Sequence, residues 1–274
     1  MSMTQTEKAH RFQALHHGPA AFVMPNPWDG GSARLLAGLG FEALATSSGA
    51  AAGTLGRRDG AIARDEALAM AQLIVRATDL PVTADLENGF GDAPATAAET
   101  VRLAAAAGLV GGSIEDASGV AERPLYDIGH ATERVAAAAE AARTLGFPFM
   151  LTARAENFLR GKPDLDDTIR RLQAFERAGA DVLFAPGLPD LAAVRAVCAA
   201  VSKPVNFMVG IRGRSFTVAE LEAAGVRRIS LATSLYRAAM SGLAAAAREV
   251  RHSGSFGYLD TCLTTQELNA FMRP

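Results

Sequence analysis

The stretch LPVTADLENGFGD, residues 80–92, combines an apolar run with two acids and two glycines. Asp85 and Glu87 stand two positions apart, so on an extended backbone their side chains point to the same side. Gly89 and Gly91 follow at once and let the chain turn away. The stretch is therefore typical of a buried strand whose carboxyl end carries a polar site.

Similar strand-like runs recur along the chain, each followed by an alanine-rich helical run. The predicted strands are 21–26, 41–49, 80–87, 109–116, 147–156, 180–187, 203–210 and 226–234. They are near-continuous apolar runs, as expected for strands covered on both faces. Eight alternating units over about 230 residues favour a single α/β domain, a parallel (β/α)8 TIM barrel, over an open doubly wound sheet.

The alternation stops after residue 250. We predict a barrel domain over 1–252, with a linker and a C-terminal helix over 253–274. Thr264 or Thr265 is the expected N-cap of that helix. A helix behind a glycine- and serine-containing linker needs a surface to cover. It is expected either on its own barrel or on a neighbouring subunit as a swapped element.

Composition argues against several classes of function. The 274 residues carry a net charge of −2 without long runs of one sign, so neither nucleic acid nor a membrane is an expected partner. We find no signal peptide and no apolar window of the roughly 20 residues that a membrane span requires. Cys198 and Cys262 form no metal-type pair. A cytoplasmic protein is predicted.

Acidic residues gather at the ends or in the loops of the second, third and fourth predicted strands. They are Asp59, Asp85, Glu87 and Glu115. Neighbouring carboxylates repel one another unless a cation relieves them, and ligands that are all oxygen favour Mg²⁺, with Mn²⁺ as a second choice. The alternative for any single acid is a helix cap or a structural ion pair.

Other polar residues near the strand ends could bind a substrate. Arg154 could take a substrate carboxylate in a bidentate contact, or it could pair structurally with Glu156 or Glu115. The segment Ser47, Ser48 and Gly49 is either a simple turn or a backbone site for a carboxylate or phosphate. Asn206 on the seventh strand is a further candidate.

Residues outside this region have simpler interpretations. His16 and His17 precede the first strand and are expected at a solvated surface, and Cys198 is expected in the core.

Seven segments together carry a resemblance to a known family: NPWDGGSARLLAGLGFEALATSSG, GRRDG, PVTADLENGFGD, GSIEDAS, TARAENF, RAGADVLFAPG and GVRRISLATS. From about residue 20 to 250 the chain resembles the isocitrate lyase/phosphoenolpyruvate mutase superfamily. The resemblance implies a (β/α)8 barrel, a magnesium ion, and substrates that are 2-oxo acids or become enolates. It also implies dimers that exchange C-terminal helices and assemble as tetramers.

The resemblance assigns roles to individual residues. Asp85 matches the direct metal ligand, whereas Asp59, Glu87 and Glu115 match acids that hold the metal's waters. Ser47, Ser48 and Gly49 match the segment that binds the substrate carboxylate. Arg154 matches the arginine that contacts the substrate.

One segment departs from the family. The lyases carry K-[KR]-C-G-H in the loop after the fourth strand, where this chain reads EDASGVAERPLYD. The mutases and phosphonopyruvate hydrolases carry a lysine where this chain has Ala117. These differences count against (methyl)isocitrate lyase chemistry and against cleavage of a phosphorus–carbon bond.

The leading hypothesis is a Mg²⁺-dependent lyase that cleaves a C–C bond of a 2-oxo or dicarboxylic acid through an enolate, similar to oxaloacetate decarboxylase. Arg154 and Glu115 are its expected catalytic residues, with Glu156 and Tyr126 as other candidate bases. The alternatives are a (2-methyl)isocitrate lyase-like or P–C bond enzyme with another catalytic acid, and a weakly catalytic barrel that binds 2-oxo acids.

Overall fold

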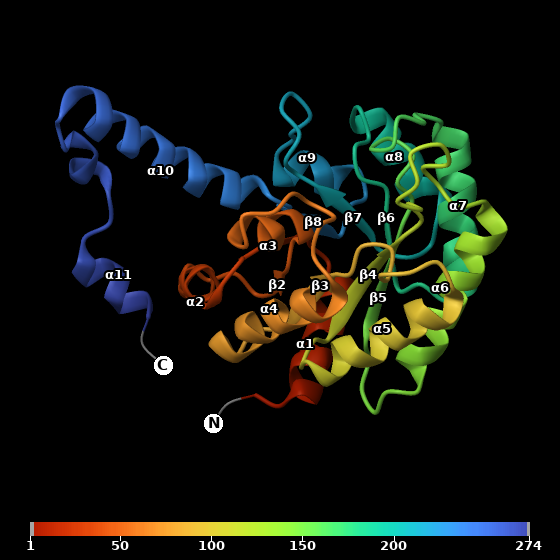
Figure 1. The fold of residues 1–274 in the computed structure, drawn as a ribbon. Helices are drawn as coiled ribbons and strands as arrows, with labels where there is room; N and C mark the ends of the chain where they lie inside the picture. Colours follow the sequence, from red (N-terminus) through yellow and green to blue (C-terminus); the bar gives the residue numbers. More distant parts are fainter. Residues whose placement is uncertain (1–2, 273–274) are drawn as a thin grey trace.

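The structure, a computed structural model, describes residues 3–272 and contains eight parallel strands arranged as a nearly closed barrel (Figure 1). The strands are β1 (Phe22–Met24), β2 (Leu44–Ala45), β3 (Val82–Asp85), β4 (Gly111–Glu115), β5 (Met150–Arg154), β6 (Val182–Phe184), β7 (Val205–Met208) and β8 (Arg228–Ser230). Their order is β1-β8-β7-β6-β5-β4-β3-β2, and the amide of Ala45 donates to the carbonyl of Pro25 at 3.0 Å across the remaining seam. The predicted TIM barrel is confirmed.

Helices alternate with the strands and surround them (Figure 1). They are α1 (Gln5–His17), α2 (Gly30–Gly38), α3 (Ser48–Thr54), α4 (Arg64–Ala77), α5 (Pro94–Ala106), α6 (Ile128–Arg143), α7 (Leu165–Ala178), α8 (Leu191–Ala200), α9 (Val218–Ala223), α10 (Ser234–Ser253) and α11 (Thr265–Phe271). Each strand is shorter than the apolar run that predicted it, because the residues after its last ladder pair turn into the loops that form the site.

The alternation of side chains along β5 shows how the core is divided. Leu151 and Ala153 belong to the large apolar cluster between strands and helices, together with Leu172 and Phe175 of α7. Met150 belongs to a second cluster inside the barrel. Successive side chains of a strand point to opposite faces, so one strand supplies both clusters.

Helix α1 closes the N-terminal end of the barrel, which we call the floor. Thr4 and Glu7 form a capping box that starts the helix. Phe12 is fully buried and lies in the inner cluster with Phe22, at 6.3 Å between ring centroids. The sequence did not reveal this helix, because its apolar residues are few and their burial depends on the barrel end.

The predicted exposure of His16 is wrong, whereas His17 is exposed as expected. His16 is buried, its ring packs edge-on against Phe12 at 4.7 Å, and its Nδ1 lies 2.8 Å from the Phe12 carbonyl. Cys198 is half-buried and packs against the main core.

The C-terminal part departs from the barrel. Helix α10 runs to Ser253, so it includes the first residue of the expected linker, and Gly254 ends it with φ +64°. A 3₁₀ helix (Gly257–Thr261) follows, and Thr264 caps α11 as predicted. Helix α11 returns to α2, where the Phe271 ring lies over Gly38.

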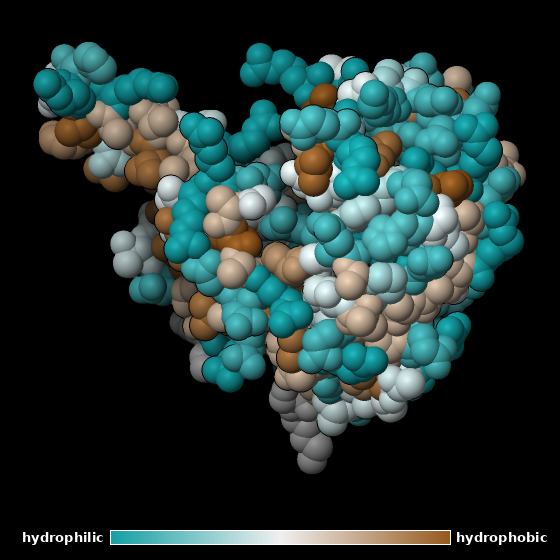
Figure 2. Space-filling model, turned by 45° about the vertical axis from the view of Figure 1, so that its right-hand side comes forward, coloured by the Kyte–Doolittle hydropathy of each residue, from teal (hydrophilic) through white to brown (hydrophobic). Residues whose placement is uncertain are grey.

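Figure 1 shows α10 projecting from the barrel, and Figure 2 shows hydrophobic residues along the underside of this projection. The exposed apolar side chains of this C-terminal arm are Met240, Leu243, Val250, Phe256, Leu259, Leu263 and Leu268. Among the described residues, no helix is both long and apolar enough to cross a bilayer.

Candidate active site

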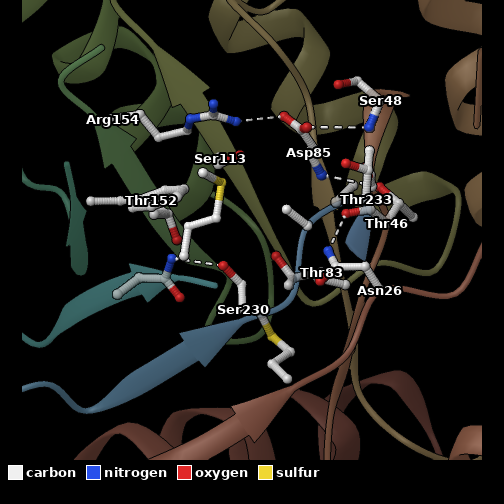
Figure 3. Close-up of a pocket in the computed structure, with 18 of the residues that line it drawn as sticks. Asn26, Thr46, Ser48, Thr83, Asp85, Ser113, Thr152, Arg154, Ser230 and Thr233 are labelled. Atoms are coloured by element: carbon white, nitrogen blue, oxygen red, sulfur yellow. Dashed lines mark hydrogen bonds and ion pairs between the residues drawn. The ribbon is translucent and has the colours of Figure 1, made fainter. Parts of the chain in front are cut away.

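A cavity of about 180 Å³ opens at the carboxyl ends of the strands, the mouth of the barrel (Figure 3). All eight strands, or the residues directly after them, line it. Asp85 ends β3, Arg154 ends β5, and Ser48 begins α3. Figure 3 shows Arg154 and Asp85 facing one another at one side of the cavity.

Arg154 is the centre of the charged network. Its guanidinium lies 2.9 Å from Asp85, 3.0 Å from Glu115 and 2.8 Å from Glu156. Its guanidinium carbon also lies 5.1 Å from the centroid of the Phe184 ring. Both structural pairings that the sequence left open are therefore present, and Asp85 adds a third. These contacts fix the guanidinium at the cavity wall.

Asp85 and the segment after β2 hold each other in place. The amide of Ser48 donates to Asp85 Oδ2 at 3.2 Å, and the Asp85 amide donates to Thr46 Oγ1 at 3.0 Å. Ser47 caps α3 by accepting from the Ala50 amide. The segment is a turn, and it also borders the cavity.

Gly49 is required by the close approach of its neighbours. A Cβ at this position would lie 2.9 Å from Thr233 Cγ2 and 3.2 Å from Asp59 Cγ. The loop that carries Asp59 can therefore reach the cavity only over a glycine.

Glu87 does not lie on the strand, so the expected shared strand face is wrong. Strand β3 ends at Asp85, and Glu87 has φ +48°, in the left-handed region that non-glycine residues seldom adopt. Its carbonyl accepts from the Glu115 amide at 2.9 Å. This strained turn places the carboxylate beside the mouth instead of one layer above Asp85.

The Glu87 carboxylate is short of partners. Within the described part of the chain, its buried Oε1 atom has no hydrogen-bond partner. Burial, together with repulsion by Asp85, Glu115 and Asp59, raises the pKa of Glu87 to about 7. The carboxyl is thus held where its charge is poorly compensated by the protein.

Glu115 and Asp59 differ in their surroundings. Glu115 is buried, which raises its pKa to about 7 against the opposing effect of Arg154. Arg160, which the sequence did not single out, also donates to Glu115 at 2.9 Å. Asp59 is exposed on the loop between α3 and α4 and borders the cavity.

These residues fit a hydrated magnesium ion. The unpaired oxygen of Glu87 and the repulsion among four carboxylates provide the negative potential that a hard cation requires, and all the donors are oxygen. Between residues 3 and 272, no three acidic, histidine or cysteine side chains are close enough to enclose a metal by themselves. Magnesium usually keeps several waters and takes only one or two carboxylates directly.

The loop after β4 is folded back on itself. Ala117 pairs with Leu125 in an isolated antiparallel bridge, and the Ser118 amide donates to the Pro124 carbonyl at 3.1 Å. Arg171 fastens the loop by donating to the Tyr126 carbonyl at 2.9 Å. The tyrosine hydroxyl donates to Asp92, and burial raises its pKa to about 12. Tyr126 is therefore unsuited to the role of base.

The structure also reveals polar residues inside the barrel that sequence analysis overlooked. Thr83, Ser113, Thr152, Arg228 and Ser230 line the lower part of the cavity, together with the expected Asn206. The sequence did contain a signal for Arg228. In the predicted strand VRRIS (226–230) it stands two residues after Val226, at a position of the same face where an apolar residue is expected.

Comparison with known proteins adds a family match. The family model described as phosphoenolpyruvate phosphomutase matches residues 12–251. A crystal structure from Burkholderia cenocepacia J2315, described as a candidate lyase/mutase, is 51% identical, with a TM-score of 0.97 and coverage of 98% of this chain and 97% of the other.

Curated relatives with named activities include a lyase and a decarboxylase. The 2-methylisocitrate lyase of Escherichia coli K12 is 30% identical over 279 residues, which are 98% of this chain and 92% of the relative. The oxaloacetate decarboxylase of Bradyrhizobium diazoefficiens is 30% identical over 210 residues, 74% and 71% of the two chains.

Proposed function

The chain belongs to the phosphoenolpyruvate phosphomutase family, within the isocitrate lyase/phosphoenolpyruvate mutase superfamily, and we propose that it is a Mg²⁺-dependent lyase that cleaves a C–C bond beside a 2-oxo acid. Its relatives with named activities include lyases, so a lyase or mutase activity is the starting point. The finer assignment rests on the residues at the mouth of the barrel.

The observation that carries the proposal is the ion pair of Asp85 and Arg154 in the wall of the cavity, with the Glu87 carboxylate close enough to interact electrostatically with both. The unpaired Glu87 oxygen and Asp85 offer negative charge to a cation. Arg154, whose guanidinium lies 2.9 Å from Asp85, offers positive charge to a substrate carboxylate. A 2-oxo acid presents a carboxylate and a neighbouring carbonyl oxygen, which match an arginine beside a cation site.

Asp85 would hold the metal directly, with Asp59, Glu87 and Glu115 acting through water. When bound, Mg²⁺ would supply Lewis-acid stabilisation of the negative charge that develops on the 2-oxo oxygen, worth several kcal/mol in such reactions. Mn²⁺ has similar ligand preferences and could replace it.

The protein's own groups would orient the substrate and manage its proton. Arg154, held by three carboxylates, would bind the substrate carboxylate together with the Ser47–Gly49 backbone. Asn206 would contribute its amide from β7. Glu115, whose pKa is raised to about 7, would hold or release a proton near neutral pH, as general acid–base catalysis requires.

Decarboxylation of oxaloacetate requires the fewest catalytic groups from this site, because CO₂ leaves without the help of an acid. The folded loop after β4 supports this choice, since neither cysteine nor lysine occurs between Glu115 and Tyr126. The similarity to 2-methylisocitrate lyase favours a second candidate, a (2-methyl)isocitrate lyase-like reaction with another catalytic acid.

The test is a product assay with purified protein and Mg²⁺ on oxaloacetate, 2-methylisocitrate and phosphonopyruvate, each repeated with EDTA. We expect pyruvate from oxaloacetate, abolished by EDTA and by Asp85→Asn. Turnover of 2-methylisocitrate alone would select the second candidate, and turnover of phosphonopyruvate would select P–C chemistry. Tight oxalate binding without turnover of any substrate would indicate a binding protein.

We also propose a homo-oligomer, a dimer of dimers that exchanges C-terminal helices. The apolar arm of α10 and the following 3₁₀ helix leaves Leu243, Phe256 and Leu259 about 60% exposed in one chain, a surface that a second copy would bury. Light scattering should give a tetramer for the full chain and a smaller species after removal of residues 254–274. A monomeric full chain would contradict this assembly.

A further inference from the structure

Arg228 is a buried positive charge inside the barrel, one layer below the proposed cation site. Only 3% of its surface is exposed, yet it lines the cavity. It stands on β8 opposite Phe22 of β1 and Asn206 of β7. Such a position in a barrel interior is normally occupied by an aliphatic side chain.

The guanidinium is bonded only to neutral groups. Nε donates to Asn206 Oδ1 at 2.8 Å, Nη2 donates to Thr152 Oγ1 at 2.9 Å, and Nη1 lies 3.4 Å from His16 Nε2. No Asp or Glu of the described residues forms an ion pair with it, and burial is what lowers its pKa, to about 9. The arginine is therefore still charged near neutral pH.

His16 cannot compensate this charge. Burial and the neighbouring Arg228 lower the pKa of His16 to about 3, so the ring is neutral, and its Nδ1 donates to the Phe12 carbonyl. A buried charge without a counter-ion is costly, and proteins seldom keep one without a partner.

The guanidinium retains capacity for a ligand. An arginine carries five N–H donors, and the three contacts above use one each of Nε, Nη1 and Nη2. Thr152 and Ser230, which Figure 3 shows on the side of the cavity away from Asp85, add hydroxyl groups. Cation, hydroxyl donors and access from the cavity make up an anion subsite.

We propose that Arg228, Thr152 and Ser230 bind a second carboxylate of the substrate, so that the enzyme selects 2-oxo dicarboxylic acids over 2-oxo monocarboxylic acids. The inference rests on the proposed function, because it places the first carboxylate at Arg154. Thr152 and Arg154 are two residues apart on β5, about 6.6 Å along the strand. That separation suits the two carboxylates of one short diacid.

The test compares two acids of equal chain length, 2-oxoglutarate and 2-oxopentanoate, which differ only in a distal carboxylate or methyl group. Binding is measured by calorimetry in Mg²⁺, without any need for turnover. Wild-type protein is expected to bind 2-oxoglutarate at least about tenfold more tightly, the usual size of a charged hydrogen-bonded contact. In R228Q the two affinities should agree within about twofold.

Two further variants control this experiment. R227Q removes a charge from the next residue, which points away and donates to the Pro19 carbonyl, and it should keep the wild-type preference. R228K keeps the charge and should keep part of the preference even if R228Q folds poorly.

Each outcome has a distinct meaning. Equal binding of both acids by wild-type protein, or an unchanged preference in R228Q, would overturn the second subsite and show that Arg228 only positions Asn206. In that case the proposed function would stand. Failure of both acids to bind in Mg²⁺ would overturn both proposals.

Discussion

The two ends of the barrel use the same strands in opposite ways. At the floor, β5 begins with Met150, which joins Phe12 and Phe22 in an apolar cluster sealed by α1. At the mouth, β5 ends with Arg154, which is surrounded by three carboxylates. Five residues thus span the change from a packed hydrophobic core to a charged site.

The difference separates stability from function. At the floor, large apolar side chains are buried against one another, so this end contributes to the free energy of unfolding. The mouth holds a strained residue, Glu87, whose buried Oε1 lacks a partner within the described chain. Such features cost stability and are retained at functional sites. Substitutions at the two ends should therefore have opposite signatures.

The largest effect is expected for Asp85→Asn at the mouth. Loss of this carboxylate should lower kcat/KM about a thousandfold and abolish Mg²⁺ binding, because it removes the proposed direct ligand. Steady-state kinetics and calorimetry measure both. Asp65→Asn, at an exposed carboxylate of α4, is the matched control and should behave as wild type. Intact activity in Asp85→Asn would refute the site.

Phe12→Ala tests the floor. Removal of this fully buried ring should lower the free energy of unfolding by about 3 kcal/mol and leave kcat of the folded protein unchanged. Urea denaturation gives the first quantity. Leu73→Ala, at a side chain of α4 that is 58% exposed, should change stability by less than about 0.5 kcal/mol. A large loss of kcat in Phe12→Ala would mean that the two ends are coupled.

His16→Gln tests the neutral histidine beneath Arg228. Because the folded pKa is about 3 and the unfolded value 6.5, the unfolded chain binds the extra proton between these values. The free energy of unfolding should therefore decrease as the pH is lowered through that window, by about 1.3 kcal/mol from pH 7 to about pH 5.5. The variant should lack this component, so the difference between the two proteins isolates it. Parallel pH profiles would show that His16 is not neutral in the fold.

The smallest effect is expected for Glu87→Gln without metal. Replacing this half-buried carboxyl removes repulsion by Asp85 and Glu115, so the variant should be more stable by about 1 kcal/mol, a figure reduced for solvent screening. Its Mg²⁺ affinity should fall. Thermal unfolding in EDTA, with Glu122→Gln at an exposed position as control, measures the gain. A less stable variant would show that repulsion by the neighbouring carboxylates does not destabilise the ionised Glu87 side chain.

Most of the fold can be predicted from the sequence, because the periodicity of apolar residues reports their burial directly. The eight strand–helix units and the Thr264 cap depend on local patterns, and the structure contains them. Helix α1 was not predicted, because its burial requires a barrel floor that only the assembled strands provide. For the same reason His16 was placed at the surface, since no local pattern distinguishes an exposed histidine from one that packs on a distant strand.

The candidate site likewise has features that local sequence predicts and features that depend on tertiary contacts. Asp85, Glu115 and Arg154 were recognisable because acids and an arginine at the ends of apolar strands are conspicuous in a sequence. The sequence alone therefore determined the barrel, the family and the charged mouth.

Tertiary structure decided how those charges are paired. It turned Glu87 out of the strand, placed Arg154 among three carboxylates and buried Arg228 among neutral groups. Local sequence specifies the direction of a side chain from its own backbone. Which charges meet depends on strand register and barrel closure, which join residues far apart in the chain.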